Sequence, residues 1–313
     1  MKLNTERIHT IWHLTWPQCI MLLCQFVIGI TDVWAGGRIG SEVQASIGLI
    51  TQCHMMFMAL AMAAVSGAVA SISQSLGACK FVRARRYVGL VTIGCIVIGS
   101  AIAVVASVWR EPLLRLIQTP ESIMPVAIMF LTATIWGIPG QYTLTIGAAV
   151  FRSAKMVLIP LYVTGTACLL NVFGDLAFGL GWWGFPAYGA TGIAYSTLVS
   201  VTVGAVLMLF LLMRHELFTR DSFPGWRWIK AGAPYLLKVA GAAFGTSFLW
   251  QTGYMVLYVI TASLPFGRVN ALAGLTTGLR VESILFLPAV AFSMTASVLV
   301  GHALGEGNHR EAK

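Results

Sequence analysis

The stretch His13-Leu-Thr-Trp-Pro-Gln-Cys-Ile-Met-Leu-Leu-Cys-Gln-Phe-Val-Ile-Gly-Ile-Thr-Asp32 is apolar over a length that can cross a bilayer, and it ends on a carboxylic acid. An acid at the centre of a membrane helix costs roughly 2.5–3.5 kcal/mol on insertion scales. Such a residue usually faces a protein-lined cavity and takes part in function. Asp32 therefore predicts a proton or cation site inside a membrane transport protein.

The composition of the whole chain indicates an integral membrane protein. The chain is 58% hydrophobic and 10% charged, whereas soluble domains carry about 25% charged residues. Apolar runs of the length that a membrane helix needs, about 20 residues, recur along it. We predict an all-α fold with eight spans, at 11–35, 46–73, 87–108, 122–148, 157–180, 188–213, 236–262 and 272–300.

The basic residues predict the orientation of these spans. Fifteen of the 20 Lys and Arg residues fall on one side of the predicted spans, and the loop at 181–187 on the other side carries no charge. The positive-inside rule then places both termini in the cytoplasm. We expect a multi-pass protein of the bacterial inner (plasma) membrane. The net charge of +9 reflects this topology and does not predict nucleic-acid binding, because the basic residues lie in separate short loops.

The chain contains a partial internal repeat with an offset of 228 residues. The offset aligns Ala61, Ala63, Ala68, Leu76, Gly77 and Ala84 with Ala289, Ala291, Ala296, Leu304, Gly305 and Ala312. An offset of six spans preserves orientation and indicates a parallel repeat of two lobes. We predict a first six-helix lobe at 1–215, a cytoplasmic linker at 216–235, and an incomplete second lobe of two helices at 236–313. We expect a truncation after the eighth helix, and poor docking of the last two helices.

Five segments together resemble the MATE (multidrug and toxic compound extrusion) family. They are Pro17 with Asp32-Val-Trp-Ala-Gly-Gly-Arg-Ile-Gly40, Asn171-Val-Phe-Gly-Asp175, Gly189-Ala-Thr-Gly-Ile-Ala-Tyr-Ser-Thr197, Leu279-Arg-Val-Glu-Ser283 and Leu299-Val-Gly-His-Ala-Leu-Gly-Glu-Gly307. The resemblance covers essentially the whole chain in register. That family has twelve helices in two six-helix lobes, and this chain stops after eight.

Two carboxylates and an amide are expected to meet in the first lobe. Asn171 and Asp175 are four residues apart and share one face of a helix. Asp32 lies near the outer end of the first span, and Asp175 lies in the outward half of the fifth. Two carboxylates in a low-dielectric cavity repel each other when both are ionised. Such a pair can hold one proton, or a sodium ion whose shell is completed by amide and hydroxyl oxygens.

The resemblance implies that Asp32 is the main coupling residue, supported by Asn171 and Asp175, with Thr197 as a weaker addition. Alternatives remain for each of them. Asp32 or Asp175 could be an interfacial, hydrated acid, Asn171 could form a helix–helix hydrogen bond, and Thr197 could simply pack.

Three further residues are candidates for the substrate cavity or for a hinge. Pro17 is either a hinge in the first span or a plain kink. Tyr142 is a weaker inference from the resemblance, with packing as the alternative. Glu282 lies in the eighth span beside Arg280, where the two could pair with each other or with other helices.

No enzyme is predicted. The sequence has no Gly-x-Ser-x-Gly, Walker A or His-Glu-x-x-His motif. The six cysteines include no C-x-x-C pair, so neither a zinc site nor a disulfide framework is expected.

Without a P-loop domain, the expected driving force is an ion gradient. We expect no cofactor, no bound metal other than a possible sodium ion at Asp32, Asn171 and Asp175, and protons as the other possible coupling ion.

The resemblance implies an ion-coupled multidrug exporter that works by alternating access. Its expected partners are the lipid bilayer and small, cationic, amphipathic drugs, because an anionic apolar cavity favours them, and we expect a monomer. One alternative is a lipid-linked sugar flippase of the same superfamily, which would need cationic residues in its cavity. The other is a membrane fragment or scaffold that does not transport.

Overall fold

The computed structural model describes residues 5–116, 119, 121, 123–262, 268–310 and 312. Side chains are described from residue 7 onward within these ranges, except at 251, 254, 255, 258, 259, 261, 262 and 268–284. Glu282 and Arg280 therefore lie outside the described side chains.

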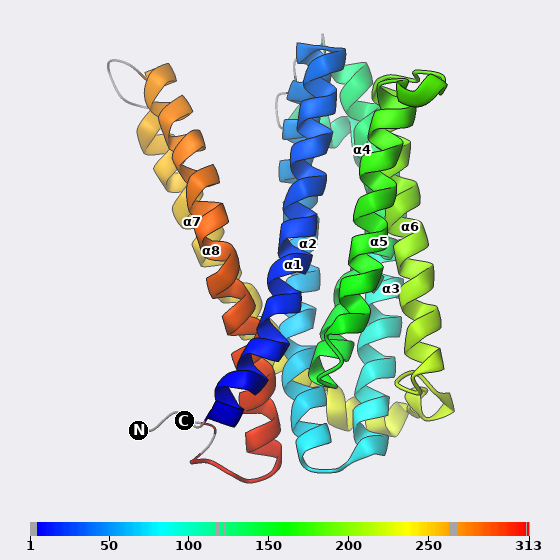
Figure 1. Cartoon of the computed structure of the whole chain (residues 1–313), viewed down its shortest axis with the longest axis vertical. Helices are drawn as coiled ribbons and strands as arrows, with labels where there is room; N and C mark the ends of the chain where they lie inside the picture. Colours follow the sequence, from blue (N-terminus) through cyan, green and yellow to red (C-terminus); the bar gives the residue numbers. More distant parts are fainter. Residues whose placement is uncertain are drawn as a thin grey trace.

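Eight long helices account for most of the described residues, which contain no β-strand. They are α1 (Thr5–Ile39), α2 (Ser41–Gly77), α3 (Phe81–Leu116), α4 (Met124–Ser153), α5 (Leu158–Gly174), α6 (Ala190–Arg214), α7 (Trp226–Ala262) and α8 (Arg268–Gly305). Seven helical segments of the described chain are long and apolar enough to cross a membrane, and α7 is not among them. The predicted all-α membrane fold is confirmed, and the helices extend beyond most of the predicted spans (Figure 1).

The predicted fifth span differs from a single α-helix. After α5 ends at Gly174, the chain continues as a π-helical turn, η1 (Asp175–Gly179). The N–H of Leu180 donates to the carbonyl oxygen of Asp175 at 3.0 Å, a bond that spans five residues. Two short 3₁₀ helices, η2 (Trp182–Gly184) and η3 (Arg220–Ser222), lie in the loops on either side of α6.

Helices α1 to α6 form one bundle. Within it α4 packs against α2, α3 and α6, while α5 packs between α1 and α6. Its largest fully buried side chains include Tyr142, Phe151 and Ile146 on α4, Ile72 on α2 and Met208 on α6. Helix α4 therefore lies at the centre of the packed core, and α5 lies toward the side of the bundle that α1 covers.

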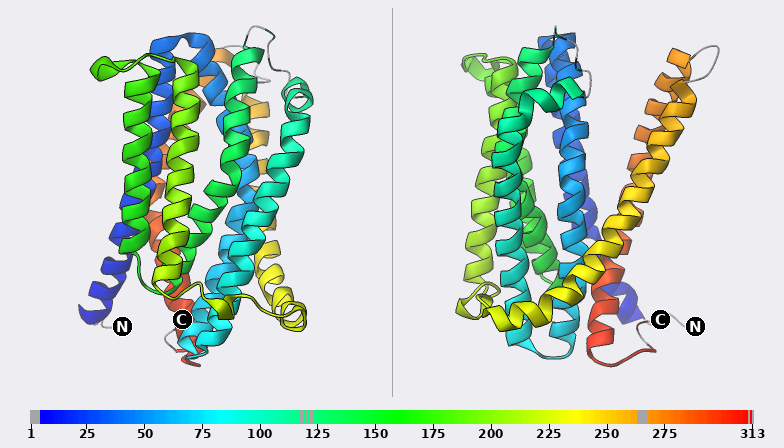
Figure 2. Two further views of the ribbon diagram at one scale, coloured as in Figure 1. Left: turned by 90° about the vertical axis from the view of Figure 1, so that its right-hand side faces the viewer. Right: turned by 180° about the vertical axis from the view of Figure 1, so that it is seen from behind.

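Helices α7 and α8 form a pair that leans away from the bundle. The pair approaches the bundle at the end where both termini lie and diverges toward the opposite end (Figures 1 and 2). Helix α7 starts at Trp226, inside the predicted linker at 216–235, so that segment is partly helical. The division into one complete and one incomplete lobe stays a prediction.

Close contacts at the termini end correct the expectation that the last two helices dock poorly. A Cβ atom built on Gly77 of α2 would lie 2.2 Å from the carbonyl oxygen of His302 on α8. A Cβ atom on Gly67 would lie 2.8 Å from the carbonyl oxygen of Leu236 on α7. Glycine permits backbones to approach this closely. At the termini end the expectation is wrong, because glycines of α2 provide a partner surface for both helices.

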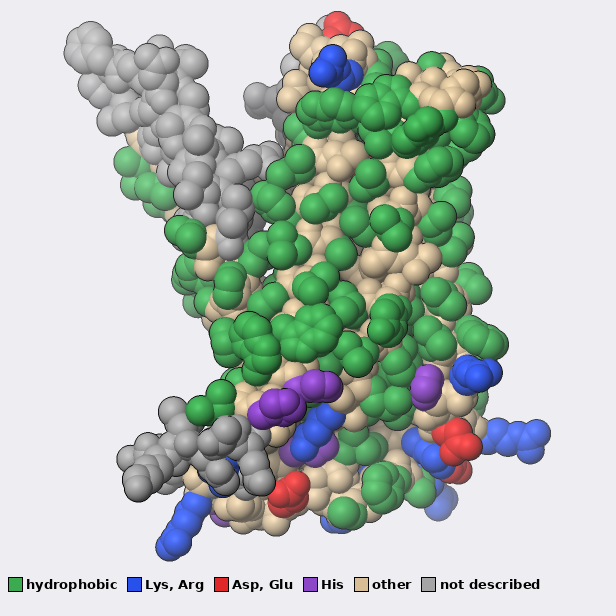
Figure 3. Space-filling view, in the orientation of Figure 1, with side chains coloured by type: hydrophobic (Ala, Val, Ile, Leu, Met, Phe, Trp, Pro, Cys, Tyr) green, Lys and Arg blue, Asp and Glu red, His purple; other side chains and the backbone are tan. Residues whose placement is uncertain are grey.

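Charged side chains concentrate at the same end of the molecule. Figure 3 shows a wide band of hydrophobic side chains, with most Lys and Arg side chains below it at the end that carries the termini. Arg83, Arg85 and Arg86 follow the turn between α2 and α3 at this end. This pattern, together with the seven membrane-spanning candidates, identifies a multi-pass membrane protein.

The glycine contact between α2 and α8 gives a first testable prediction. Gly77→Ala is expected to destabilise the protein by about 1–3 kcal/mol, because the new methyl group overlaps the His302 backbone and one helix must move. Gly48→Ala on the same helix is the matched control, since a Cβ atom there meets nothing within 4 Å. It should stabilise the helix by about 0.5–1 kcal/mol. Thermal unfolding in detergent measures both, and equal Tm values for the two variants would contradict the α2–α8 contact.

Candidate functional site

Asp32 of α1 lies against α5. Its carboxyl group lies close to the side chains of both Asp175 and Asn171. The Oδ1 atom of Asp32 is buried and has no hydrogen-bond donor. The structure thus brings together three polar side chains from α1, α5 and η1, and two of the three are acids.

Asn171 and Asp175 are fully buried on the face of α5 and η1 that points into the bundle. Asn171 Nδ2 donates to Thr197 Oγ1 of α6 at 3.0 Å. Thr197 Oγ1 in turn lies 3.2 Å from the carbonyl oxygen of Ile193, to which it donates. These bonds tie the amide of Asn171 to α6, and the Oδ1 atom of Asn171 is buried without a donor.

Four buried oxygens in this cluster have no donor. They are Asp32 Oδ1, Asn171 Oδ1 and both carboxyl oxygens of Asp175. Each buried acceptor left unpaired costs about 1–3 kcal/mol, and more when it is charged. Two ionised carboxylates can only accept hydrogen bonds, so they cannot satisfy each other. A proton shared by the pair would satisfy one oxygen of each acid, and a small cation would be an acceptable partner for all four oxygens.

The oxygen atoms of this cluster suit a proton or a hard monovalent cation better than a transition metal. Carboxylate, amide and hydroxyl oxygens are hard ligands, and Asp32, Asp175, Asn171 and Thr197 supply only such atoms. Among the residues that the structure describes, no group of three His, Cys, Asp or Glu side chains could hold a metal ion.

Small residues position this cluster by bringing α5 and α6 together. A Cβ atom on Gly174 would lie 2.4 Å from Ser196 Oγ, and one on Gly192 would lie 2.2 Å from the carbonyl oxygen of Phe178. Both positions therefore require glycine for the two helices to approach. The π-helical turn starts at Asp175 itself, and such turns frequently mark functional sites.

Pro17 lies a little over three helical turns from the start of α1 at Thr5, and it is buried inside an unbroken helix. Its neighbours Thr15 and Gln18 are buried as well and both contact Thr295 of α8. Thr15 Oγ1 lies 3.0 Å and Gln18 Nε2 lies 2.8 Å from Thr295 Oγ1. Pro17 therefore belongs to the contact between α1 and α8, and not to the acid cluster.

The structure does not bring Tyr142 to the cluster. Its ring is buried in the core with 1% of its surface exposed, and its hydroxyl donates to the carbonyl oxygen of Phe57 on α2 at 2.5 Å. Tyr142 lies on the face of α4 that contacts α2, and it is therefore a packing residue. Glu282 falls outside the described side chains, so its proposed role in a cavity stays a prediction.

Sequence reasoning missed two features at the termini end. The first is the buried group formed by Thr15, Gln18 and Thr295, which joins residues almost 280 positions apart. The second is Arg152, whose guanidinium is buried with Nε unpaired and with Nη1 3.5 Å from the sulfur of Met294. Neither has a local signal in the sequence, because each depends on where α8 docks.

Comparisons with known proteins place these features in a family. A sequence model of the MatE family matches residues 17–176 and 242–313. The chain is 27% identical over 286 residues to the probable multidrug resistance protein NorM of Thermotoga maritima, covering 91% of this chain and 60% of that protein. It is 22% identical over 300 residues to a protein of Shewanella oneidensis named FAD transporter, covering 95% and 65% of the two chains.

Solved structures share the fold. A crystal structure of a variant of the Vibrio cholerae MATE transporter VcmN superimposes with a TM-score of 0.87 at 20% sequence identity, over 97% of this chain and 67% of that chain. At this identity the likeness concerns the fold alone. This chain spans about 60–66% of the length of the curated relatives that it matches.

Proposed function

Because this chain belongs to the MatE family, we propose that it acts in ion-coupled efflux of small molecules by alternating access. The observation that carries this proposal is the cluster of Asp32, Asp175 and Asn171, in which four of the five side-chain oxygens are buried without a donor. A buried acid pair without a counter-charge is costly, and it is useful where a proton or a cation must bind and leave.

The proposed coupling runs along α1. Asp32 lies near one end of this helix beside α5, whereas Thr15 and Gln18 near the other end bind Thr295 of α8. Binding of a proton or sodium ion would remove the repulsion between Asp32 and Asp175 and let α1 pack more closely against α5. A shift of α1 at Asp32 would then be transmitted past Pro17 to the α1–α8 contact, which closes the termini end.

The proposed substrates are cationic, amphipathic drugs. The acid cluster carries negative charge when no ion is bound, and a positively charged compound competes for it directly. The names of two relatives, multidrug resistance protein and FAD transporter, show that substrates differ among relatives. A lipid-linked sugar flippase remains the alternative within transport, and a membrane fragment that does not transport is the alternative outside it.

We also propose an orientation of the chain in the membrane. The termini end carries most of the basic side chains (Figure 3), which supports a cytoplasmic location for both termini under the positive-inside rule. Helices α7 and α8 diverge from the bundle at the opposite end (Figure 2), which is proposed to face the outside of the inner membrane. The proposed functional unit is a monomer.

Transport by the 313-residue chain in proteoliposomes tests the proposal. A fluorescent cationic dye such as ethidium should move against its gradient when a proton gradient or a sodium gradient is imposed, and not when both are collapsed. Comparing the two gradients identifies the coupling ion. If a correctly inserted and folded chain moves no dye under either gradient, the chain is not an exporter by itself and the fragment interpretation is favoured.

A further inference from the structure

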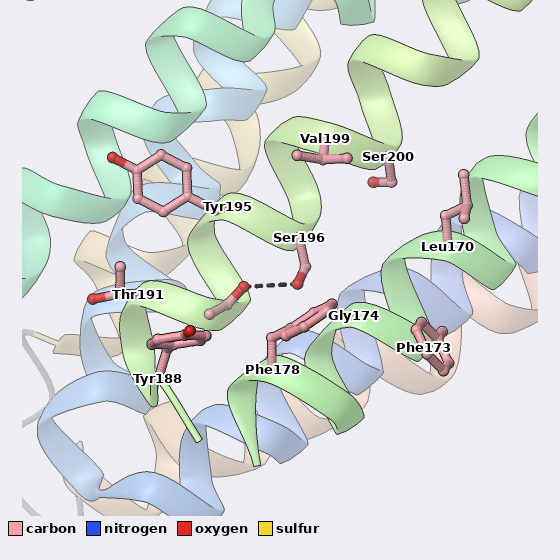
Figure 4. Close-up of a pocket in the computed structure, with 11 residues that line it drawn as sticks. Leu170, Phe173, Gly174, Phe178, Tyr188, Thr191, Tyr195, Ser196, Val199 and Ser200 are labelled. Atoms are coloured by element: carbon pink, nitrogen blue, oxygen red, sulfur yellow. Dashed lines mark hydrogen bonds between the residues drawn. The ribbon is translucent and has the colours of Figure 1, made fainter. Parts of the chain in front are cut away.

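A groove lies between α5, η1 and α6 on the side facing away from the acid cluster. On α5, Leu170 and Phe173 line it and are partly exposed, whereas Asn171 and Asp175 point into the bundle. On α6, Val199 lines it with 56% of its surface exposed. The groove therefore opens on the outer surface of the bundle (Figure 4).

The groove has the size and lining of a site for an apolar ligand. Its volume is about 510 Å³, within the range of about 300–1,000 Å³ that is usual for ligand pockets. Aromatic and aliphatic side chains form most of its walls, and none of its lining residues is charged. The hydroxyl of Ser196 is already bonded to the carbonyl oxygen of Gly192 at 2.7 Å. A ligand there must gain most of its binding from apolar contact.

The surface around the groove decides which apolar ligand can reach it. Helices α5 and α6 are both long and apolar enough to span the membrane. Further exposed apolar side chains lie on both helices, such as Leu169 on α5 and Val203 on α6. Because this surface faces the hydrocarbon of the bilayer, lipid chains are the molecules in direct contact with the groove.

Aromatic residues mark the end of the groove that lies away from the termini. Trp182, Trp183 and Tyr188 are exposed there, at the loop between η1 and α6. Trp183 stacks on Phe173 of the groove wall, with ring centroids 5.6 Å apart. Trp and Tyr side chains of this kind concentrate at the level of lipid headgroups. An acyl chain entering from that level would extend down the groove toward Val199.

We propose that this groove binds an acyl chain of a phospholipid from the leaflet opposite the termini. Gly174 and Ser196 of its lining are already in close contact, since a Cβ atom on Gly174 would lie 2.4 Å from Ser196 Oγ. The bound chain adds apolar contact to the α5–α6 pair that carries Asn171 and Thr197. This binding follows from the shape and surroundings of the groove, and it does not depend on the proposed transport.

Photo-crosslinking tests the site with a defined lipid. The 313-residue chain is placed in liposomes with a phosphatidylethanolamine that carries a diazirine on one acyl chain, irradiated, and digested for mass spectrometry. We expect adducts concentrated in residues 170–178 and 188–200, well above those on the exposed face of α3. Excess unlabelled phosphatidylethanolamine should lower these adducts several-fold and leave the adducts on α3 less affected.

A groove-filling variant and its control complete the test. Val199→Trp should reduce the groove adducts several-fold, whereas Val206→Trp, an equally exposed position on α6 outside the groove, should leave them unchanged. Leu170→Trp serves as a second filling variant if Val199→Trp fails to fold. Uniform labelling of all lipid-facing helices would overturn the proposal. So would adducts that ethidium removes and excess phospholipid does not, since the groove would then be a solute site.

Discussion

Asp32→Asn is expected to remove ion-coupled export while the protein still inserts and folds. The substitution keeps the size of the side chain and its contact with Asn171, but it cannot exchange a proton or balance a cation. Coupling between two sites typically amounts to about 5- to 150-fold, and we expect a loss of that order in gradient-driven dye transport. Drug resistance of cells expressing the variant, normalised to its level in the membrane, provides the second measurement.

The control for this variant is Glu42→Gln, which makes the same chemical change at an exposed acid in the first turn of α2. It should export like the unmodified chain. Infrared difference spectra recorded between acidic and basic pH give a readout independent of transport. The carbonyl band of a protonated carboxyl group should weaken in Asp32→Asn and persist in Glu42→Gln. Unchanged export by Asp32→Asn at equal expression would show that Asp32 is not the coupling residue.

The acid cluster could be predicted from the sequence because each member has a local signal. Asp32 interrupts an apolar run, and Asn171 and Asp175 are separated by one helical turn. Thr197 was assigned to the site only through the resemblance, since no spacing rule joins residues on different helices. The structure places the two side chains 3.0 Å apart.

Other features had no signal that the sequence could provide. The π-helical turn at Asp175 depends on how η1 packs against Gly192 and Ile193 of α6. Tyr142 was a cavity candidate only through the family resemblance, with packing as the alternative. Its hydroxyl is instead satisfied by a backbone carbonyl of α2, a partner that a sequence pattern does not reveal.

The docking of α8 was predicted least well, for a physical reason. Apolar periodicity shows which residues avoid water, but in a membrane both lipid and protein satisfy that requirement. The face that docks is set by small residues on the partner helix, such as Gly77, and by buried hydroxyls such as Thr15 and Thr295. These contacts make the α1–α8 interface specific, and they permit a direct test of whether it must open.

A disulfide between α1 and α8 is expected to stop export completely. The Oγ1 atoms of Thr15 and Thr295 are 3.0 Å apart and buried, so cysteines at these positions point toward each other at a separation suited to a disulfide. With the native cysteines replaced by alanine, Thr15→Cys/Thr295→Cys should crosslink rapidly on oxidation. If alternating access requires the termini end to open, the oxidised protein is locked and a reductant restores transport.

The matched control keeps the same two helices and moves one cysteine to the exposed face of α8. Ser297 is exposed and lies two residues beyond Thr295, so its side chain points away from α1. Thr15→Cys/Ser297→Cys should therefore not crosslink and should export equally with and without oxidant. Full crosslinking of the first pair with undiminished export would show that α1 and α8 stay together throughout transport. The path from Asp32 along α1 to Thr295 would then not be the route of coupling.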